Sequence, residues 1–148
     1  MSLPIQLIST DFDGTLFAEF ENPPVPPSLQ AIIGSLQAQG ARWVINTGRD
    51  LSSLMETMGR AQLTIHPDYL VIVEREIYQR DGSRYVGMED WNRGCTQAHE
   101  ELFARVGPDV PQLMEWVDER FAATLYVDPY SPFCLIAESN KDADAIIE

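Results

Sequence analysis

Apolar residues in the first half of this chain occur in short runs, separated by stretches with helical spacing. The runs at residues 5–10, 42–46 and 69–73 are mostly apolar and partly β-branched, as in buried strands. Between them, apolar residues three or four positions apart predict helices over residues 28–40 and 51–58. The order strand, helix, strand, helix, strand predicts an α/β fold with a Rossmann-like parallel sheet.

The pattern changes after residue 73. Two short runs at residues 77–80 and 84–86 flank Asp81-Gly82, a pair that is typical of a tight hairpin turn. The remaining predicted elements are two helices, two strands and a helix that opens with a capping box, at residues 96–106, 110–120, 122–127, 133–137 and from 140 onward. This mixture predicts an α+β region that follows the parallel-sheet core.

Two polar motifs directly follow the first two predicted strands. Asp11-Phe12-Asp13-Gly14-Thr15 follows the first strand, and Thr47-Gly48-Arg49 follows the second. Ligands of parallel sheets bind beyond the carboxyl ends of the strands, so both motifs are expected to face one crevice. Carboxylates at a strand end are costly unless a cation binds there, and the Gly-Thr turn offers N–H and hydroxyl donors to an anion. The motifs therefore predict a phosphate-handling site that needs a metal ion.

Composition narrows the classes of protein to consider. With 148 residues, of which 45% are hydrophobic and 22% charged, the chain is suited to a globular fold with a core. Its formal net charge of −13, with no basic stretch, argues against nucleic-acid and anionic-membrane partners. No membrane-spanning run or signal peptide is recognisable, and Cys95 and Cys134 are expected to be reduced, so we expect a cytoplasmic protein.

The two motifs resemble those of the haloacid dehalogenase-like (HAD) hydrolases, most of which are phosphatases. Asp11 to Thr15 matches the family's Asp-x-Asp-Gly-Thr motif, and Thr47 matches the Thr or Ser that ends its second strand. The form Thr47-Gly48-Arg49 is similar to the branch with a large α+β (C2) cap, which includes Cof-type sugar phosphatases, sucrose phosphatases and phosphomannomutases. The resemblance implies that residues 1–80 are the N-terminal part of the core and residues 81–148 the start of the cap.

The resemblance also implies a role for the residues of both motifs. Asp11 would be the nucleophile that forms an aspartyl-phosphate, and Asp13 would be the general acid and base. The Asp11 carboxylate and the Asp13 main-chain carbonyl would hold Mg²⁺. The main-chain N–H groups of Phe12, Asp13 and Gly48, with the Thr47 hydroxyl, would bind the phosphoryl oxygens.

Arg49 has two interpretations from the sequence alone. It either contacts phosphate or substrate, or it is an arginine at a helix start that pairs with a nearby acid. In the family, residues of the cap select the substrate, which makes Trp116, Asp118 and Arg120 candidate substrate contacts.

Two departures from the family pattern change the expectation for this chain. The family's third-motif lysine and fourth-motif acidic pair are not found, and the only lysine, Lys141, precedes a predicted helix in the cap region. The Asn-Gly that is common after the third core strand is replaced by Glu74-Arg75-Glu76. We therefore expect that the C-terminal half of the core is absent from this chain. A complete active site would then need either that half or a partner at the exposed edge of strand 5–10. The isolated chain would have little activity.

The sequence thus predicts a magnesium-dependent phosphatase acting on a small phosphomonoester, a sugar phosphate, through an aspartyl-phosphate. Two alternatives stay open. One is a phosphomutase, in which the phosphoryl group on Asp11 returns to the substrate. The other is a catalytically inactive binding or regulatory module that keeps the acidic pocket. In each case the expected partner is a small phosphorylated metabolite.

Overall fold

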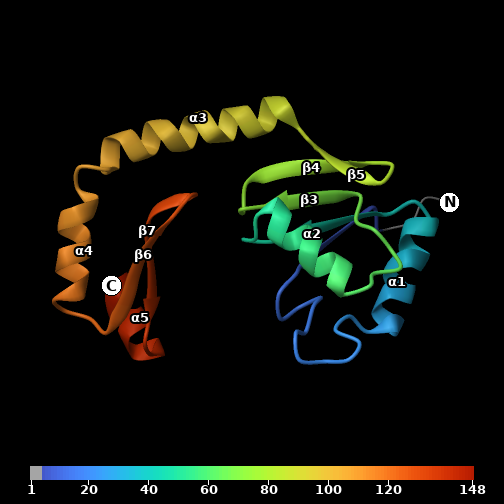
Figure 1. Cartoon of the computed structure of the whole chain (residues 1–148), viewed down its shortest axis with the longest axis horizontal. Coiled ribbons are helices and arrows are strands. Elements are labelled where there is room, and N and C mark those ends of the chain that lie inside the picture. Colours follow the sequence, from blue (N-terminus) through green and yellow to red (C-terminus); the bar gives the residue numbers. More distant parts are fainter. Residues whose placement is uncertain (1–4) are drawn as a thin grey trace. The chain divides into compact units, whose positions relative to one another are not determined.

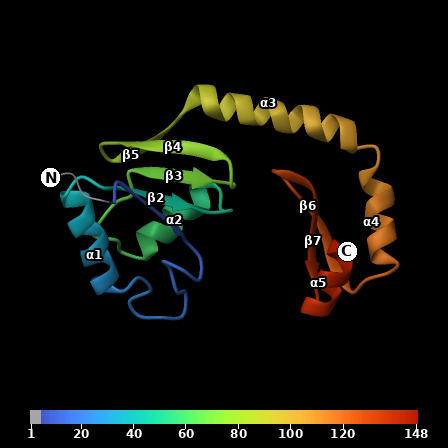
Figure 2. The same cartoon turned by 180° about the vertical axis from the view of Figure 1, so that it is seen from behind.

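The computed structural model of the chain describes residues 5–148, which form two compact units that divide after Cys95 (Figures 1 and 2). The first unit contains five strands and two helices: β1 Leu7–Asp11, α1 Pro27–Ala38, β2 Arg42–Asn46, α2 Leu51–Arg60, β3 Tyr69–Ile72, β4 Glu76–Asp81 and β5 Arg84–Gly87. Helix α3, Glu89–Val106, begins in the first unit and continues into the second. The second unit adds α4 Val110–Asp118, β6 Ala123–Asp128, β7 Ser131–Ala137 and α5 Asn140–Ile147.

The five strands of the first unit form one sheet in the order β1-β2-β3-β4-β5. Strands β1, β2 and β3 are parallel, and Asp11 at the end of β1 lies opposite Asn46 at the end of β2. Strands β4 and β5 are antiparallel and form a hairpin, whose turn contains Gly82 at a φ of 62°. The parallel order with crossover helices and the hairpin confirm the predicted α/β fold.

The core of this unit lies on one face of the sheet. Alternate residues of the parallel strands are buried there, and so is one side of each crossover helix. The main members are Trp43, Ile45, Leu70, Ile72, Ile33 and Leu54. On the other face, Leu7 is 60% exposed and Val44 is half-buried. Successive right-handed crossovers place their helices on the same side, which explains why only one face is covered.

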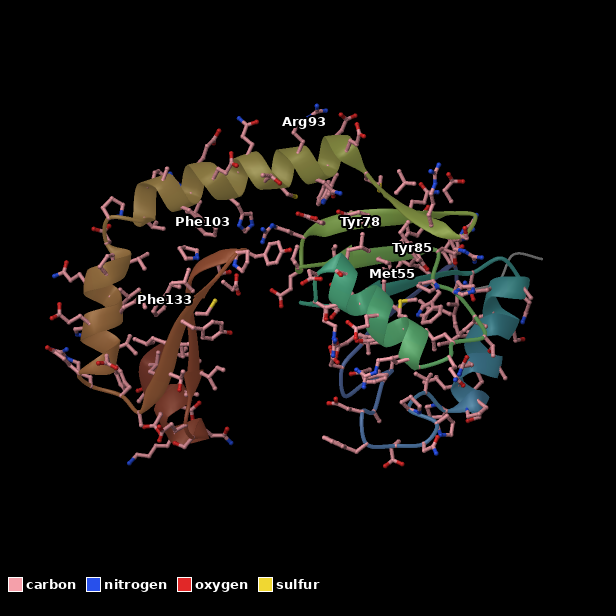
Figure 3. The ribbon with its side chains drawn as sticks, viewed as in Figure 1. Met55, Tyr78, Tyr85, Arg93, Phe103 and Phe133 are labelled. Atoms are coloured by element: carbon pink, nitrogen blue, oxygen red, sulfur yellow. The ribbon has the colours of Figure 1, made fainter. Side chains whose placement is uncertain are left out.

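The hairpin is joined to the core through Tyr85 of β5 (Figure 3). Its hydroxyl donates a hydrogen bond to the carbonyl oxygen of Pro67 at 3.0 Å. Burial raises the pKa of Tyr85 to about 12, so the hydroxyl keeps the proton that this bond needs.

The start of α3 differs from the prediction. The helix begins at Glu89 and not near residue 96. Residues 89–95 are mostly polar and have no apolar period, so the sequence pattern does not mark them as helical. Contacts with the hairpin region hold this turn. The Asn92 side chain bonds both the N–H and the carbonyl of Ile77, at 2.8 and 3.0 Å, and the Trp91 indole N–H donates to the Arg75 carbonyl at 2.9 Å.

The second unit is a small α+β arrangement. Helix α4 packs against β6 and β7, and α5 contacts β7. The predicted cap of α5 is present, because the Ser139 hydroxyl accepts the N–H of Asp142 at 3.1 Å. The division of the chain at residue 80 into core and cap stays a prediction. Among residues 5–148, no helix is long and apolar enough to cross a membrane, and Cys95 and Cys134 are free.

Asp68 connects β2 to the segment that leads into β3. Its carboxylate accepts the N–H of Trp43 at 2.9 Å, the Gln37 amide at 2.9 Å and the Arg42 guanidinium at 2.7 Å. Burial acts to raise the pKa of Asp68, but these hydrogen bonds outweigh it, and the pKa is lowered from 3.8. The ionised form therefore stabilises the folded state above the unfolded pKa. This contribution is lost as the pH falls through the folded pKa.

We expect Asp68→Asn to lower the free energy of unfolding by about 1–2 kcal/mol at pH 7, because it weakens charge-assisted hydrogen bonds. The difference from the wild type should shrink as the pH falls below about 4, where the wild-type carboxylate takes up a proton. Urea unfolding at neutral and acidic pH measures both effects. Asp81→Asn, which removes an exposed ion pair with Arg84, is the matched control and should change little. Equal stability of the Asp68 variant and the wild type at pH 7 would contradict this role.

Candidate active site

The loop after β1 folds around the carboxylate of Asp11. One oxygen of this carboxylate accepts the N–H of Phe12 at 2.7 Å, and the other accepts the Thr15 hydroxyl at 3.0 Å. Gly14, at a φ of 71°, allows the turn, and its N–H donates to the Phe17 carbonyl at 2.9 Å. The motif therefore orients its own first carboxylate, which stays exposed to solvent.

Phe12 anchors this loop in the core. It is fully buried, and its ring stacks on that of Phe17 with centroids 5.3 Å apart. The residues on either side, Asp11 and Asp13, are both exposed. The Phe12 N–H, expected from the sequence to bind phosphate, donates to Asp11 in this structure. A phosphate contact of Phe12 would thus require Asp11 to release this N–H.

The end of β2 meets the end of β1 at a shallow hollow. Thr47 is buried, and its side-chain oxygen accepts the N–H of Arg49 at 3.2 Å, which leaves the hydroxyl hydrogen to donate. The hollow has a volume of about 340 Å³ and is lined by Ser9, Asp11, Asn46, Thr47, Gly48 and Glu74. Three residues that the sequence singled out, Asp11, Thr47 and Gly48, therefore lie together.

Arg49 binds Asp13 with both arms of its guanidinium group. Its Nε and Nη2 donate to the two carboxylate oxygens, each at 2.7 Å. The third nitrogen, Nη1, donates to Ser53 and Thr57 on α2 at 3.0 and 2.9 Å. The group also lies 5.7 Å from the centre of the Phe12 ring. Of the two interpretations of Arg49, the structure shows the arginine paired with a nearby acid.

This ion pair affects the chemistry that Asp13 can perform. The hydrogen bond from Arg49 lowers the pKa of Asp13, and partial burial opposes the shift only in part. The ionised carboxylate is suited to accept a proton, whereas a general acid must carry one. Asp13 is therefore held in the state of a base while the pair with Arg49 is made.

Glu74 is a residue of the hollow to which the sequence analysis gave no role. It follows β3, and one of its carboxylate oxygens lies 3.6 Å from the point that a Cβ on Gly48 would occupy. One signal was present in the sequence. Asparagine and glycine tolerate a left-handed backbone, and this chain has Glu74-Arg75-Glu76 where the family commonly has Asn-Gly. Val73 and Glu74 nevertheless adopt a left-handed backbone here.

Two of the candidate substrate contacts in the second unit, Trp116 and Arg120, interact with each other. The Arg120 guanidinium donates to the Trp116 carbonyl at 3.1 Å and lies 5.2 Å from the centre of the Trp116 ring. Asp118 ends the same helix, and Lys141 is exposed in the first turn of α5. Their part in substrate binding stays a prediction.

The oxygen donors at the end of β1 fit Mg²⁺ in kind. Asp11 has an exposed carboxylate, and the Asp13 carbonyl lies two residues away on the same turn. Mg²⁺ is usually bound by one or two carboxylates, with water and substrate phosphate completing its shell. No group of three or more His, Cys, Asp or Glu residues that could hold a metal ion is found in residues 5–148. Asp11 and the Asp13 carbonyl are oxygen donors of the kind that binds a magnesium ion together with a substrate phosphate.

Comparison with known proteins bears on the segment that contains both motifs. Residues 8–73, from β1 to the residue after β3, match the sequence profile of one family. They match the haloacid dehalogenase-like hydrolases. This HAD-like segment includes Asp11, Asp13, Thr47, Gly48 and Arg49, so the profile covers the candidate site and supports a hydrolase.

A solved structure and a search of curated proteins complete the comparison. The structure of yhjK from Bacillus subtilis, described as a haloacid dehalogenase-like hydrolase protein, aligns with 14% identity and a TM-score of 0.48. The alignment covers 97% of this chain and 65% of that protein, so the present chain spans less than two thirds of its length. No curated protein matches the chain.

Proposed function

We propose that this chain provides the nucleophile and the phosphate-binding turn of a magnesium-dependent phosphatase that acts on a small phosphomonoester. One observation carries the proposal: the Asp11 carboxylate lies in the same hollow as Thr47 and Gly48, at the ends of two adjacent parallel strands. A nucleophilic oxygen and hydrogen-bond donors for an anion are thus within one site. The match of residues 8–73 to the HAD-like hydrolases supports the same chemistry.

The reaction would proceed in two steps on Asp11. In the first, Asp13 is released by Arg49 and carries a proton. An Asp11 oxygen then attacks phosphorus and forms an aspartyl-phosphate, while Asp13 gives that proton to the departing alcohol. In the second, Asp13 takes a proton from a water molecule that attacks the same phosphorus, which frees Asp11 and inorganic phosphate. The Thr47 hydroxyl and the Gly48 N–H would donate hydrogen bonds to the phosphoryl oxygens in both steps.

The Asp11 carboxylate and the Asp13 main-chain carbonyl would hold Mg²⁺. When bound, the ion would supply positive charge that stabilises the phosphoryl oxygens as negative charge develops on them. Arg49 would lie outside this group, because its guanidinium is used by Asp13, Ser53 and Thr57.

Further parts of the proposal concern the substrate and the rest of the site. Resemblance to the Cof-type and sucrose-phosphatase branch favours a sugar phosphate, with residues 81–148 as the start of a substrate-selecting cap in a cytoplasmic enzyme. The same resemblance implies a lysine and an acidic pair from a C-terminal half of the core or from a partner at β1. A phosphomutase would use the same first step and return the phosphoryl group to the substrate.

One observation favours a second candidate, an inactive binding module. Arg49 holds both oxygens of Asp13, and this favours the ionised form over the acid that phosphoryl transfer needs. Such a module would bind a phosphorylated metabolite at Thr47 and Gly48 and release no phosphate. Phosphate release from p-nitrophenyl phosphate by the full-length protein distinguishes the two candidates.

We expect this phosphate release to depend on Mg²⁺. Removal of divalent ions with EDTA should abolish activity, and added Mg²⁺ should restore it. Ca²⁺ should restore little, since its larger and looser shell places the phosphate differently. Adding Mg²⁺ should also raise the melting temperature of the wild type more than that of Asp11→Asn. Full activity after exhaustive treatment with EDTA would contradict the assignment.

A further inference from the structure

The turn that follows β3 has an uncommon backbone conformation. Val73 and Glu74 have positive φ angles of 44° and 60°. Residues other than glycine and asparagine rarely adopt this region, and a β-branched valine does so at a clear cost. Two hydrogen bonds to the loop after β2 fix the turn, from Val73 N–H to the Arg49 carbonyl at 3.0 Å and from Glu74 N–H to the Thr47 carbonyl at 3.2 Å. The loop that carries the phosphate donors therefore also sets the position of Glu74.

This conformation places the Glu74 side chain beside the proposed phosphate-binding turn. Glu74 is exposed and lines the hollow together with Asp11, Thr47 and Gly48. One Glu74 carboxylate oxygen lies 3.6 Å from the point that a Cβ on Gly48 would occupy, so the carboxylate and the Gly48 backbone are close neighbours. A phosphomonoester bound at Thr47 and Gly48 would thus have Glu74 as a neighbour.

A carboxylate in this place restricts what the rest of the ligand can be. Among residues 5–148, Glu74 has no side-chain hydrogen bond or ion pair that would neutralise it. A carboxylate only accepts hydrogen bonds, so it attracts hydroxyl groups and repels carboxylates and further phosphates. No arginine or lysine lines this hollow, so no side chain of the hollow offsets the charge of Glu74.

We infer that Glu74 is a specificity-determining residue, which accepts hydrogen bonds from hydroxyl groups of the leaving group and rejects leaving groups with a second negative charge. The inference rests on the proposed function, since it names the substrate class of the same site. That class is the phosphomonoesters of neutral polyhydroxy alcohols. Discrimination here comes from the core of the protein, in addition to any selection by a cap.

Glu76, two residues after Glu74, provides a matched control. The Glu76 carboxylate accepts the Tyr78 hydroxyl at 3.3 Å, and Glu76 pairs with Ile72 in the sheet. It does not line the hollow. Glu76→Gln removes the same charge as Glu74→Gln from the same segment, so it reports the effect of net charge alone.

The test compares glycerol 3-phosphate with 3-phosphoglycerate, which share a three-carbon skeleton and differ in a hydroxymethyl and a carboxylate group. Binding is measured by calorimetry with Mg²⁺ in the full-length protein, with Asp13→Asn in every variant to slow hydrolysis, because this substitution leaves the Asp11 carboxylate and the Asp13 main-chain carbonyl in place for Mg²⁺. We expect tighter binding of glycerol 3-phosphate when Glu74 is present. Glu74→Gln should shift the ratio of the two dissociation constants about tenfold toward 3-phosphoglycerate, because one nearby charge repulsion is removed. Glu76→Gln should leave the ratio within about twofold, since that charge lies outside the hollow.

An unchanged ratio in Glu74→Gln would overturn the inference, as would failure of both ligands to bind. Equal weakening of both ligands that excess Mg²⁺ reverses would also overturn it, because Glu74 would then be holding the cation. Phosphate release by the protein with Asp13 intact tests the proposed function separately. Release together with an unchanged ratio overturns only the role of Glu74. A shifted ratio without release supports that role and overturns the phosphatase.

Discussion

Asp11→Asn in the full-length protein is expected to reduce phosphate release by at least about 10³-fold, since the amide cannot act as the nucleophile. The fold should be retained. The asparagine oxygen can still accept the Phe12 N–H, and the amide NH₂ can donate to the Thr15 hydroxyl, in place of the two contacts of the carboxylate. The measurement is the rate of phosphate release from p-nitrophenyl phosphate in Mg²⁺, with the melting temperature as a check on folding.

Asp50→Asn is the control for this experiment. Asp50 caps α2 and accepts the N–H of Ser53 at 2.8 Å, a contact that asparagine also makes well. The variant removes one negative charge near the site and should keep both activity and stability. A rate for Asp11→Asn within a few-fold of the wild type would exclude Asp11 as the nucleophile.

Asp13→Asn should lower turnover by about 10²–10⁴-fold, the range that positioned acids and bases contribute. The first step should suffer less than the second when the leaving alcohol is a good one such as p-nitrophenol, because Asp11 is intact. Phosphate should therefore accumulate on the protein in a form that hydroxylamine releases. The measurement combines the steady-state rate with the amount of protein-bound phosphate after rapid quenching.

Arg49→Met is the comparison for Asp13→Asn. It removes the two hydrogen bonds that orient Asp13 and leaves the carboxylate itself in place. Its effect on turnover should be smaller, and the double variant should resemble Asp13→Asn alone, since the arginine acts through the aspartate. Additive effects of the two substitutions would show that Arg49 acts independently of Asp13.

Much of the fold could be predicted because hydrophobic pattern and turn chemistry agreed. The parallel strands are short apolar runs, each ends in a polar motif, and Asp81-Gly82 marks the hairpin. The meeting of Asp11 with Thr47 and Gly48 followed from one general property of parallel sheets, that their carboxyl ends share an edge. The start of α3 could not be predicted in this way, because tertiary contacts of Trp91 and Asn92 stabilise a polar turn.

The detailed geometry of the site was less accessible to sequence reasoning. Arg49 has two acidic neighbours, Asp13 across the site and the adjacent Asp50, and only the three-dimensional structure shows which one it binds. The turn at Val73 and Glu74 could not be predicted from the sequence for another reason. Neither residue is of a type that favours a positive φ, so local preference argues against the conformation that is found.

Strand β1, which carries Asp11, lies at the edge of the sheet, and this position affects the candidate site. Within residues 5–148 it pairs only with β2, along Leu7–Asp11, so its outer edge offers main-chain groups to another strand. Local opening of that single ladder of hydrogen bonds would move Asp11 relative to Thr47 and Gly48, which follow β2. A strand added at the outer edge would hold Asp11 from both sides. In the proposed phosphatase, the readiness of the site would therefore be coupled to assembly: whatever pairs with β1 would act as a part of the active site without touching the substrate.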